Sequence, residues 1–307
     1  MQMVETPRRG HDSVTGVTLT TRLSGTGRRR RRYPRSTRPP GMPVPLHERK
    51  YDSQPVIEAG AVADDARSRG KERPETPTSV LPCYNPDLRS HLVETYDGTA
   101  YPDRYFGGSC YRLPAAPGPN EVGLVGGFGI GGPVTAMVVE ALVDAGTERF
   151  CICGRAGVLA AAGDGRDRVP ESTAVVADAA LRDEGTSYHY EPASRSVAAA
   201  AEIREAMVAA LAAADIDHRV GPTWTVDALF RETVAEVERY TAEGVLTVEM
   251  EAATAFTVAR HHDAAAGAVF VPSDYVTTEG WDPLFGDDLG LLWRVGEAVV
   301  RALASAD

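Results

Sequence analysis

The sequence predicts an α/β protein, and two observations support this class. Between residues 79 and 304, short apolar runs rich in β-branched residues alternate with alanine-rich runs of helical character. Polar or glycine-rich turns separate these runs. Strands that alternate with helices form a parallel or mixed sheet covered by helices, so we expect this arrangement here. Hydrophobic residues make up 43% of the 307 residues, which is enough for a packed core.

The elements follow from these runs in chain order. A strand that ends at Cys83 is followed by Asn85, Pro86 and Asp87, a strong turn sequence that also begins a helix. Residues 51–78 are polar and are expected to be a solvated stretch. Apolar, β-branched runs predict six further strands: 122–125, 150–154, 172–180, 220–226, 245–248 and 268–271. Alanine-rich or amphipathic runs predict helices at 134–145, 196–214, 252–260 and 289–304.

Charge is distributed unevenly along the chain. Residues 1–50 contain 12 basic and 3 acidic residues, whereas the other 257 residues contain 20 basic and 40 acidic ones. Lys50 and Lys71 are the only lysines. An acidic, almost lysine-free body suits high salt, where carboxylates stay hydrated and their repulsion is screened, so we expect a halophilic source. Such a surface also argues against nucleic acid as a partner of the body.

Residues 1–50 are expected to form a disordered basic extension, with Arg28–Arg32 as a run of five arginines. Their composition buries too little apolar surface to offset the entropy of ordering. The alternatives are a tail that binds nucleic acid or a membrane surface, and a true start at Met42. No apolar run is long enough to span a membrane, so we expect a soluble, cytoplasmic protein with no membrane partner.

The four cysteines show neither zinc spacing nor a dense disulfide pattern. Cys151 and Cys153 fall inside a strand-like run, so we expect buried thiols there and no metal site.

Two carboxylates stand where the apolar run 245–248 gives way to a helix. Glu249 and Glu251 bracket Met250. Buried unpaired carboxylates are costly, so these side chains need partners. A ligand rich in hydroxyls is one interpretation, and the other makes both glutamates first-turn residues that complement the helix dipole. The pattern alone leaves both open.

A glycine-rich turn, residues 126–133, joins the strand 122–125 to a helix. Backbone N–H groups in such a turn can bind an anion, and the helix dipole adds to the attraction. Gly127, Gly129 and Gly132 also fit the spacing of a dinucleotide-binding fingerprint. However, the acidic residues that follow, Asp144 and Glu148, lie in or just after the helix instead of at a second strand end. The turn therefore predicts an anion site, and the dinucleotide match is weak.

These segments resemble the nucleoside phosphorylases of the uridine phosphorylase and hexameric purine nucleoside phosphorylase type. The resemblance rests on residues 249–253 (EMEAA), 128–133 (FGIGGP), 182–190 and 273–274. It runs from about Ser79 to Ala304 and implies the three-layer α/β/α phosphorylase fold with a central mixed sheet. Residues 51–307 would then form one catalytic domain. It further implies that Met250 packs on the ribose and Glu251 accepts hydrogen bonds from its hydroxyls, with Glu249 beside them.

The resemblance also assigns the base site. Asp274 matches an aspartate that protonates the departing purine, although a helix N-cap is the other interpretation of this residue. Asp227 and Arg231 lie in the segment that contacts the base, and His189 matches a residue that meets the substrate or serves as a structural hydrogen-bonder. The uracil-reading motif of the family is missing, which disfavours uridine, yet the glycine turn and the His189 loop look more like the uridine branch. The base is therefore left open.

Phosphate recognition is the weakest part of the resemblance. Leu88 stands where the family has an arginine and Arg89 follows one residue late, while Ile152 replaces a second arginine and Arg155 a threonine. Orthophosphate needs cationic or N–H donors. The residues expected to supply them are Gly127, Gly129, Arg104, Arg155 and Arg89, with Arg104 donated across a subunit interface.

The resemblance therefore implies phosphorolysis of a nucleoside to free base and ribose 1-phosphate. Inorganic phosphate is the co-substrate and no cofactor is expected. A dimer-based homo-oligomer, a hexamer in the family, is expected as the assembly. Hydrolysis by a nucleosidase of the same fold and a non-catalytic nucleoside-binding module are the alternatives.

Overall fold

A computed structural model describes residues 47, 49–70, 76–101, 108–160, 168–284 and 289–306. Residues 44–307 form one compact unit, to which every element below belongs. Arg104 and nearly all of the expected basic extension lie outside the described residues, so the predictions about them stay untested.

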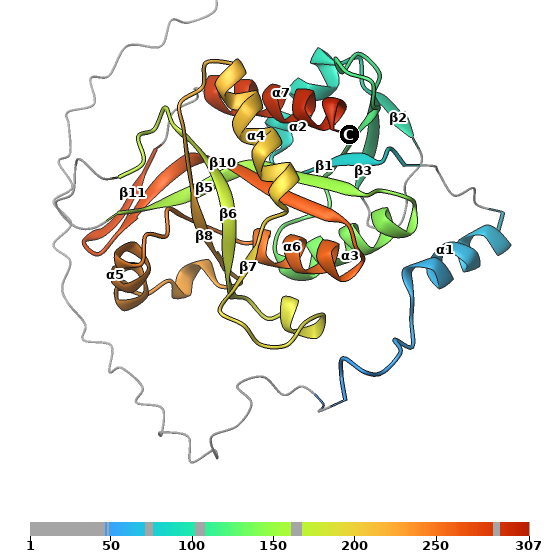
Figure 1. Cartoon of the computed structure of the whole chain (residues 1–307), viewed down its shortest axis with the longest axis horizontal. Helices are drawn as coiled ribbons and strands as arrows, with labels where there is room; N and C mark the ends of the chain where they lie inside the picture. Colours follow the sequence, from blue (N-terminus) through green and yellow to red (C-terminus); the bar gives the residue numbers. More distant parts are fainter. Residues whose placement is uncertain are drawn as a thin grey trace, which may run out of the picture. The chain divides into compact units, whose positions relative to one another are not determined.

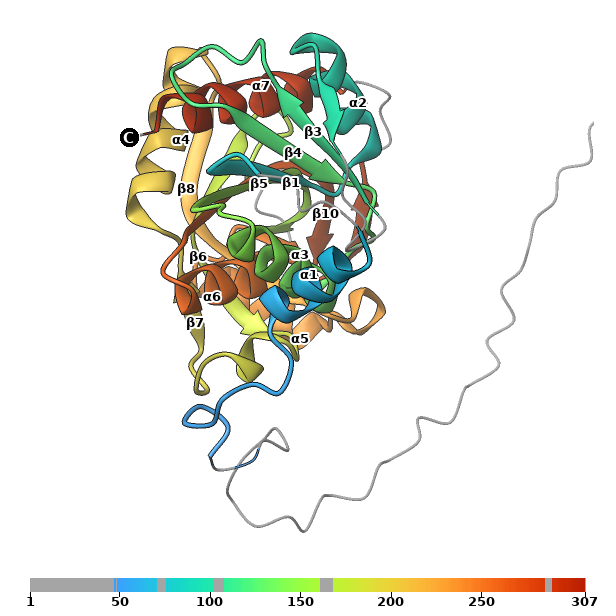
Figure 2. The same cartoon turned by 90° about the vertical axis from the view of Figure 1, so that its right-hand side faces the viewer.

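Helices cover both faces of a mixed sheet, in three layers (Figures 1 and 2). One helical layer contains α2 (Pro86–Thr95), α4 (Ala201–Ala213) and α7 (Gly290–Ser305). The layer on the opposite face contains α3 (Gly132–Asp144) and α6 (Ala252–His261), with α1 (Ala59–Ser68) beside α3. This arrangement confirms the predicted three-layer α/β/α fold.

The sheet mixes parallel and antiparallel pairs. Its strands run in the order β11-β10-β6-β8-β9-β5-β1-β4-β3-β2, and β7 pairs with β6. Because β10 also pairs with β5, the strands β5, β10, β6, β8 and β9 close a ring. The strands are β1 (Ser79–Cys83), β2 (Thr99–Tyr101), β3 (Ser109–Leu113), β4 (Val122–Gly126), β5 (Arg149–Ala160), β6 (Ala174–Asp183), β7 (Ser196–Ala198), β8 (His218–Val226), β9 (Thr247–Glu249), β10 (Ala265–Thr277) and β11 (Gly280–Pro283).

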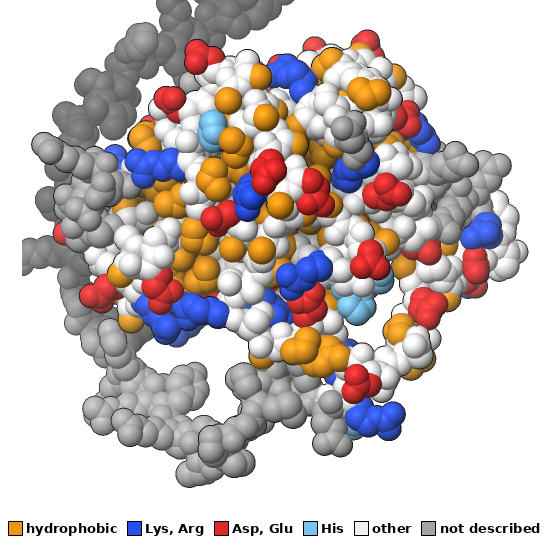
Figure 3. Space-filling view, in the orientation of Figure 1, with side chains coloured by type: hydrophobic (Ala, Val, Ile, Leu, Met, Phe, Trp, Pro, Cys, Tyr) orange, Lys and Arg blue, Asp and Glu red, His pale blue; other side chains and the backbone are white. Residues whose placement is uncertain are grey.

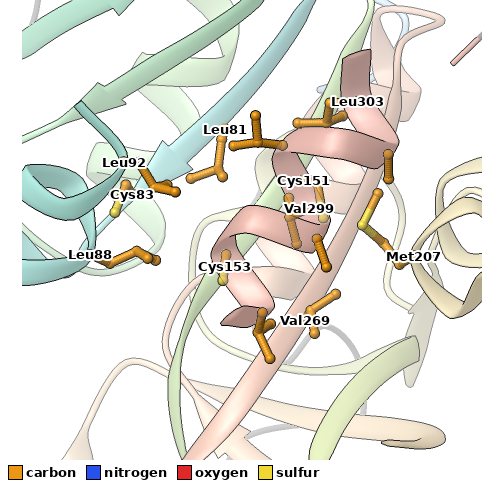
Figure 4. Packing of buried hydrophobic residues seen from close by; sticks show 14 of the residues in the cluster. Leu81, Cys83, Leu88, Leu92, Cys151, Cys153, Met207, Val269, Val299 and Leu303 are labelled. Atoms are coloured by element: carbon orange, nitrogen blue, oxygen red, sulfur yellow. The ribbon is translucent and has the colours of Figure 1, made fainter. Parts of the chain in front are cut away.

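Apolar clusters on the two faces of the sheet form the core. The cluster under α4 and α7 includes Leu81, Cys151 and Val269 from the strands and Val299 from α7 (Figure 4). All four cysteines are free and buried, which confirms the prediction made for Cys151 and Cys153. Burial raises the pKa of the Cys83 thiol to about 12, so this side chain behaves as a small hydrophobic group.

Three sequence predictions about elements need correction. Residues 196–214 were predicted as one helix, but the segment begins with β7 and turns into α4 only at Ala201. The stretch 51–78 was expected to be solvated, and it contains the helix α1. The exposed carboxylates and arginines of this helix are the polar residues on which that expectation rested. The strand expected at 268–271 extends through β10 to Thr277, because pairing with β5 and β11 satisfies its polar second half.

The chain also has elements that the sequence analysis did not predict. These are the short strands β2, β3 and β11, and α5 (Val234–Ala242), which begins with a capping box between Thr233 and Glu236. No helix in the described ranges has the length and apolar character needed to cross a lipid bilayer.

Candidate active site

The N-termini of α3 and α6 meet at one hydrogen bond. The backbone N–H of Gly131, at the end of the glycine-rich turn, donates to Oε1 of Glu251 at 2.6 Å. Glu251 is the N-cap residue of α6 and is only 8% exposed. Burial raises the pKa of the Glu251 carboxyl, and the Gly131 hydrogen bond opposes this effect. Two segments 120 residues apart in sequence are thus joined at a carboxylate.

Glu249 is engaged within the protein. Its Oε2 accepts hydrogen bonds from the N–H groups of Glu251 and Ala252 at 2.8 and 2.7 Å, and its Oε1 accepts from the Thr225 hydroxyl at 2.5 Å. Burial and the Glu251 charge raise the pKa of Glu249 to about 8. These hydrogen bonds hold the start of α6, but Glu249 belongs to β9 and Glu251 is the N-cap residue, so neither is a first-turn residue as the helix-dipole interpretation requires. The predicted contact of Glu249 with substrate stays a prediction.

A third buried glutamate fixes the loop that follows β6. Glu184 accepts hydrogen bonds from the N–H groups of Thr186 and Ser187 at 2.6 and 2.9 Å, and from the Thr254 hydroxyl of α6 at 3.0 Å. A Cβ on Gly132 would lie 2.8 and 2.9 Å from the hydroxyls of Thr254 and Thr186. Glycine at 132 therefore lets α3 approach this loop and α6 closely.

The glycine turn has a backbone that favours glycine. Gly127, Gly129 and Gly131 have φ values of 80°, 99° and 94°, a region that other residues rarely adopt. Such a turn presents successive N–H groups from one concave surface, which is a common anion-binding arrangement. Gly127 and Gly129 are exposed, so this surface is open to a ligand.

Arg89 lies against the glycine turn. A Cβ on Gly127 would be 2.6 Å from Nη1 of Arg89, and a Cβ on Gly126 would be 3.0 Å from its Cδ. Leu88 instead is fully buried and packs against Gly296 of α7. The side chain of Asn85 accepts hydrogen bonds from the N–H groups of Asp87 and Leu88 and so caps α2. Among the described residues no carboxylate pairs with Arg89, so its charge is free to bind an anion.

Tyr84 lines the same region, and the sequence analysis did not select it. Its hydroxyl hydrogen-bonds Thr135 at 2.7 Å, and its ring meets Phe128 of the glycine turn edge to face at 5.2 Å. Burial, and next the Glu251 charge, raise the pKa of Tyr84. The hydroxyl therefore stays protonated beside Glu251. A lone tyrosine after a strand carries no signal that could have identified it.

Asp274 lies inside β10, which corrects the alternative that it caps a helix. The chain bulges between Pro272 and Asp274. One Asp274 oxygen accepts a hydrogen bond from the Ser273 hydroxyl, and Oδ2 accepts from Nε1 of Trp281 at 2.8 Å. Trp281 comes from β11 and is 63% exposed. The β10–β11 hairpin thus holds both oxygens of the candidate acid.

The other predicted residues are spread around these groups. Asp227 accepts a hydrogen bond from Gly185 N–H at 2.7 Å, and its charge acts on Glu251. Met250 is half-buried, whereas Arg231 and His189 are exposed. No hydrogen bond of the His189 ring to another described side chain occurs, so its structural alternative gains no support.

Arg155 lies on the Asp274 side of the sheet. It pairs with Val271, and Gly157 pairs with Asp274, in one parallel ladder. A Cβ on Gly157 would be 3.2 Å from Oδ2 of Asp274, and residues two apart in a strand share a face. The register therefore places Arg155 near Asp274, and its predicted contact with phosphate stays a prediction.

Glu232 is a further carboxylate near Asp274 that the sequence analysis did not select. It follows the short 3-10 helix Leu229–Arg231 and is half-buried. Burial first, then the charges of Asp274 and Glu236, raise the pKa of Glu232 to about 7. Nothing in its local sequence separates it from the surface glutamates of α5.

Within the described residues no group of metal-ligating side chains is assembled.

Comparison with known proteins supports the resemblance drawn from the sequence. Residues 120–290 match the model of the phosphorylase superfamily. A guanosine phosphorylase of Halorubrum lacusprofundi is 36% identical over 141 residues, which are 46% of this chain and 56% of that protein. Uridine phosphorylases of Escherichia coli and Thermococcus kodakarensis are each 28% identical, over 46% of this chain and 59% and 53% of theirs.

The chain thus spans little more than half the length of these relatives. The matched region contains the glycine turn, both site glutamates and Asp274. Because the family model covers more than half of the 307 residues, this chain belongs to the phosphorylase superfamily.

Proposed function

We propose that this protein cleaves the N-glycosidic bond of a nucleoside with inorganic phosphate as the nucleophile. The observation that supports this proposal is the hydrogen bond between Gly131 N–H and Glu251. It joins the residue expected to bind the sugar to the glycine turn expected to bind phosphate. An acceptor of ribose hydroxyls and a cradle for phosphate have to lie this close, because phosphate attacks the anomeric carbon of the bound sugar.

The reaction balances without a covalent enzyme intermediate. The bond from C1′ of ribose to the base nitrogen breaks, and its electron pair leaves with the base, which takes up a proton. A phosphate oxygen forms the new bond to C1′, giving ribose 1-phosphate. Positive charge develops on the ribose ring during this exchange, as in other glycosyl transfers. The buried carboxylate of Glu251 would bind the sugar hydroxyls and stabilise this charge.

Arg89 and the N–H groups near Gly127 and Gly129 would hold the phosphate. Arg89 contacts the turn and has no carboxylate partner among the described residues, which supports this role. Asp274 would accept hydrogen bonds from the base or pass a proton to it, with Asp227 and Arg231 nearby. These are proposed roles. They agree with the relatives, which are named guanosine and uridine phosphorylases.

A nucleosidase, with water in place of phosphate, is the second candidate. The observation in its favour is that Leu88 and Ile152, which replace two arginines of the family pattern, are both buried in the core. The anion site therefore has less positive charge than the family pattern supplies. Arg89 at the glycine turn restores one cation, which is why we favour phosphorolysis.

Phosphate dependence separates the two candidates. The purified full chain is incubated in high salt with guanosine, inosine, adenosine or uridine, with and without phosphate, and base and ribose 1-phosphate are measured by chromatography. We expect base release that requires phosphate and yields ribose 1-phosphate in equal amount. Equal base release without phosphate would establish the nucleosidase, and binding without turnover would establish a non-catalytic module.

The expected homo-oligomer is a separate proposal. A dimer-based assembly follows from the family resemblance, and light scattering on the purified chain tests it: a monomer would contradict it.

A further inference from the structure

We propose that the base of the nucleoside stacks on the indole ring of Trp281, and that this contact favours two-ring bases over one-ring bases. This inference rests on the proposed function and deepens it, because it concerns the base that is released. The family resemblance assigned the base site to Asp274, Asp227 and Arg231, and Trp281 is not among these residues.

Three neighbouring strands bring Asp274 close to the segment that contains the candidate sugar ligand. Asp274 of β10 pairs with Gly157 of β5, and Gly157 pairs with Val248 of β9. A Cβ on Gly157 would lie 3.2 Å from Oδ2 of Asp274 and 3.0 Å from Cγ1 of Val248. The two side chains therefore converge over this glycine, and Glu251 follows Val248 by three residues. A nucleoside that is bound through its ribose at Glu251 can place its base beside Asp274.

The ring of Trp281 is fixed beside the same carboxylate oxygen. Its Nε1 donates a hydrogen bond to Oδ2 of Asp274 at 2.8 Å. In the β10–β11 ladder Trp281 pairs with Val276, and Cγ2 of Val276 would lie 3.0 Å from the same Cβ on Gly157. Residues that are paired, or two apart in a strand, share a face of a sheet, so the indole lies on the face of Asp274 and Val276. Because Nε1 is the only polar atom of the indole and is already used, the ring faces are what Trp281 presents to a ligand.

Trp281 is the most exposed of the three tryptophans. It is 63% exposed, whereas Trp224 is fully buried and Trp293 is 38% exposed and stacks on His91 with 4.6 Å between ring centroids. A single exposed apolar side chain is ordinary on a protein surface. Trp281 differs because its own N–H holds the ring against the candidate base acid. A ring that is fixed before binding loses little conformational entropy when a ligand stacks on it.

Apolar side chains border this region on the side of α5. Val276 packs against the cluster that contains Val237 of α5, and α5 contacts β10. The segment that leads into α5 also exposes large apolar side chains, namely Leu229 (54%), Phe230 (95%) and Val234 (58%). The neutral base of a nucleoside suits such a place, since it offers ring faces to apolar side chains and polar edges to Asp274.

The size of the base decides how much of the indole it covers. A two-ring base covers more of the ring face than a one-ring base, and stacking strengthens with the apolar area in contact. Loss of an aromatic side chain on which a base stacks weakens binding by about tenfold or more. We therefore expect purine nucleosides to depend on the ring of Trp281, and pyrimidine nucleosides to depend on it little.

The test compares Trp281→Leu with Trp281→Phe. Neither variant can donate to Asp274 and both are apolar, but only Trp281→Phe keeps an aromatic ring. The ligands are 9-deazainosine and pseudouridine, a two-ring and a one-ring nucleoside whose carbon–carbon glycosidic bonds neither phosphate nor water cleaves. Isothermal titration calorimetry measures their dissociation constants. We expect Trp281→Leu to bind 9-deazainosine about tenfold more weakly than Trp281→Phe does, and pseudouridine less than about threefold more weakly.

Steady-state kinetics give a second reading. From Trp281→Phe to Trp281→Leu, KM for inosine should rise about tenfold with little change in kcat, because a stacked base is held in the bound substrate and in the transition state alike. Trp293→Leu, the matched change on α7, should bind and cleave as the wild type does. Equal constants for Trp281→Leu and Trp281→Phe would overturn the proposal. A lower mass by light scattering with unchanged affinity would also overturn it, because a second copy of the chain would then cover the ring.

A measurement on the ring itself guards against a variant that folds poorly. In Trp293→Phe, Trp281 is the one exposed tryptophan, so quenching of indole fluorescence by acrylamide reports on it. Saturating 9-deazainosine should reduce this quenching, and unchanged quenching would overturn the proposal. If the wild type neither binds nor cleaves nucleosides, the proposed function fails. If it cleaves them with phosphate and only the Trp281 results disagree, this inference alone fails.

Discussion

Two groups of carboxylates in this molecule have opposite surroundings. Glu184, Glu249 and Glu251 are 5%, 6% and 8% exposed, and each carboxylate accepts a hydrogen bond from at least one backbone N–H group. Asp274 and Glu232 are half-buried, and described residues leave Glu232 without a donor. On the surface shown in Figure 3, acidic and basic side chains lie interspersed, which is a third and ordinary environment.

This difference indicates that the two groups of carboxylates have different roles. Carboxylates that hold helix starts and loops give a rigid frame, and their loss costs stability as well as activity. Asp274 is held by the side chains of Ser273 and Trp281 instead of by backbone N–H groups, and Glu232 accepts no hydrogen bond from a described residue. In the proposed function, the first group would serve sugar and phosphate binding, and the second group would lie at the base. Changes to each group should separate these effects.

The largest effect is expected at Glu251. Glu251→Gln keeps an oxygen that can accept from Gly131 N–H, but it removes the charge that would stabilise the ribose cation. We expect kcat/KM for nucleosides to fall at least about 100-fold, roughly 3 kcal/mol of transition-state stabilisation. Steady-state kinetics measure this, with Glu238→Gln as the control at an exposed site. A Glu251→Gln enzyme as fast as the wild type would place the sugar elsewhere.

The next effect is a pH dependence of stability that Glu249 creates. Its pKa is about 8 in the folded protein and near 4.5 when unfolded, so the native state binds more protons between these values. The free energy of unfolding should therefore fall as pH rises from about 5 to 8, by roughly 3 to 4 kcal/mol from this group. Urea unfolding at several pH values measures the trend.

Glu249→Gln should flatten this trend, although Glu232 and Glu251 contribute to it with the same sign. A variant with an unchanged slope would show that Glu249 is ionised in the folded protein at neutral pH.

A smaller effect is expected at Arg89. Arg89→Ala removes the cation beside Gly127, so KM for phosphate should rise about tenfold while kcat changes little. The matched control is Arg69→Ala, an exposed arginine just after α1. A parallel fall of activity at saturating phosphate would point to a role of Arg89 in folding of the turn, against the prediction.

The smallest effect is expected at Trp281. Trp281→Phe keeps an aromatic ring but removes the N–H that donates to Asp274. Loss of one neutral donor, about 1 kcal/mol, should lower kcat/KM about fivefold. Kinetics with nucleoside measure the loss, and Trp293→Phe, a half-exposed tryptophan on α7, is the control. If Trp281→Phe matches the wild type, the hairpin has no part in orienting Asp274.

Local patterns predicted much of the fold. The strand, glycine turn and helix at β4 and α3 form where expected, because the apolar run, the positive-φ glycines and the following helix former are adjacent in sequence. The length of β10 was missed, since partners far away in sequence satisfy its polar half.

The site was harder to predict than the fold. Local sequence could not decide which of Glu249 and Glu251 caps the helix, because the answer depends on Thr225 and Gly131 in other elements. Arg89 reaches the turn because Leu88 is buried against α7, a consequence of how α2 is rotated. Glu232 has no local signature, since its environment comes from tertiary packing.

The central claim is that Glu251 holds the hydroxyls of the ribose. It is tested most directly by comparing a ribonucleoside with its 2′,3′-dideoxy analogue in the wild type and in Glu251→Gln. The account predicts that the wild type prefers the ribonucleoside by about 100-fold in kcat/KM and that the variant loses most of this preference. An undiminished preference in Glu251→Gln would contradict it.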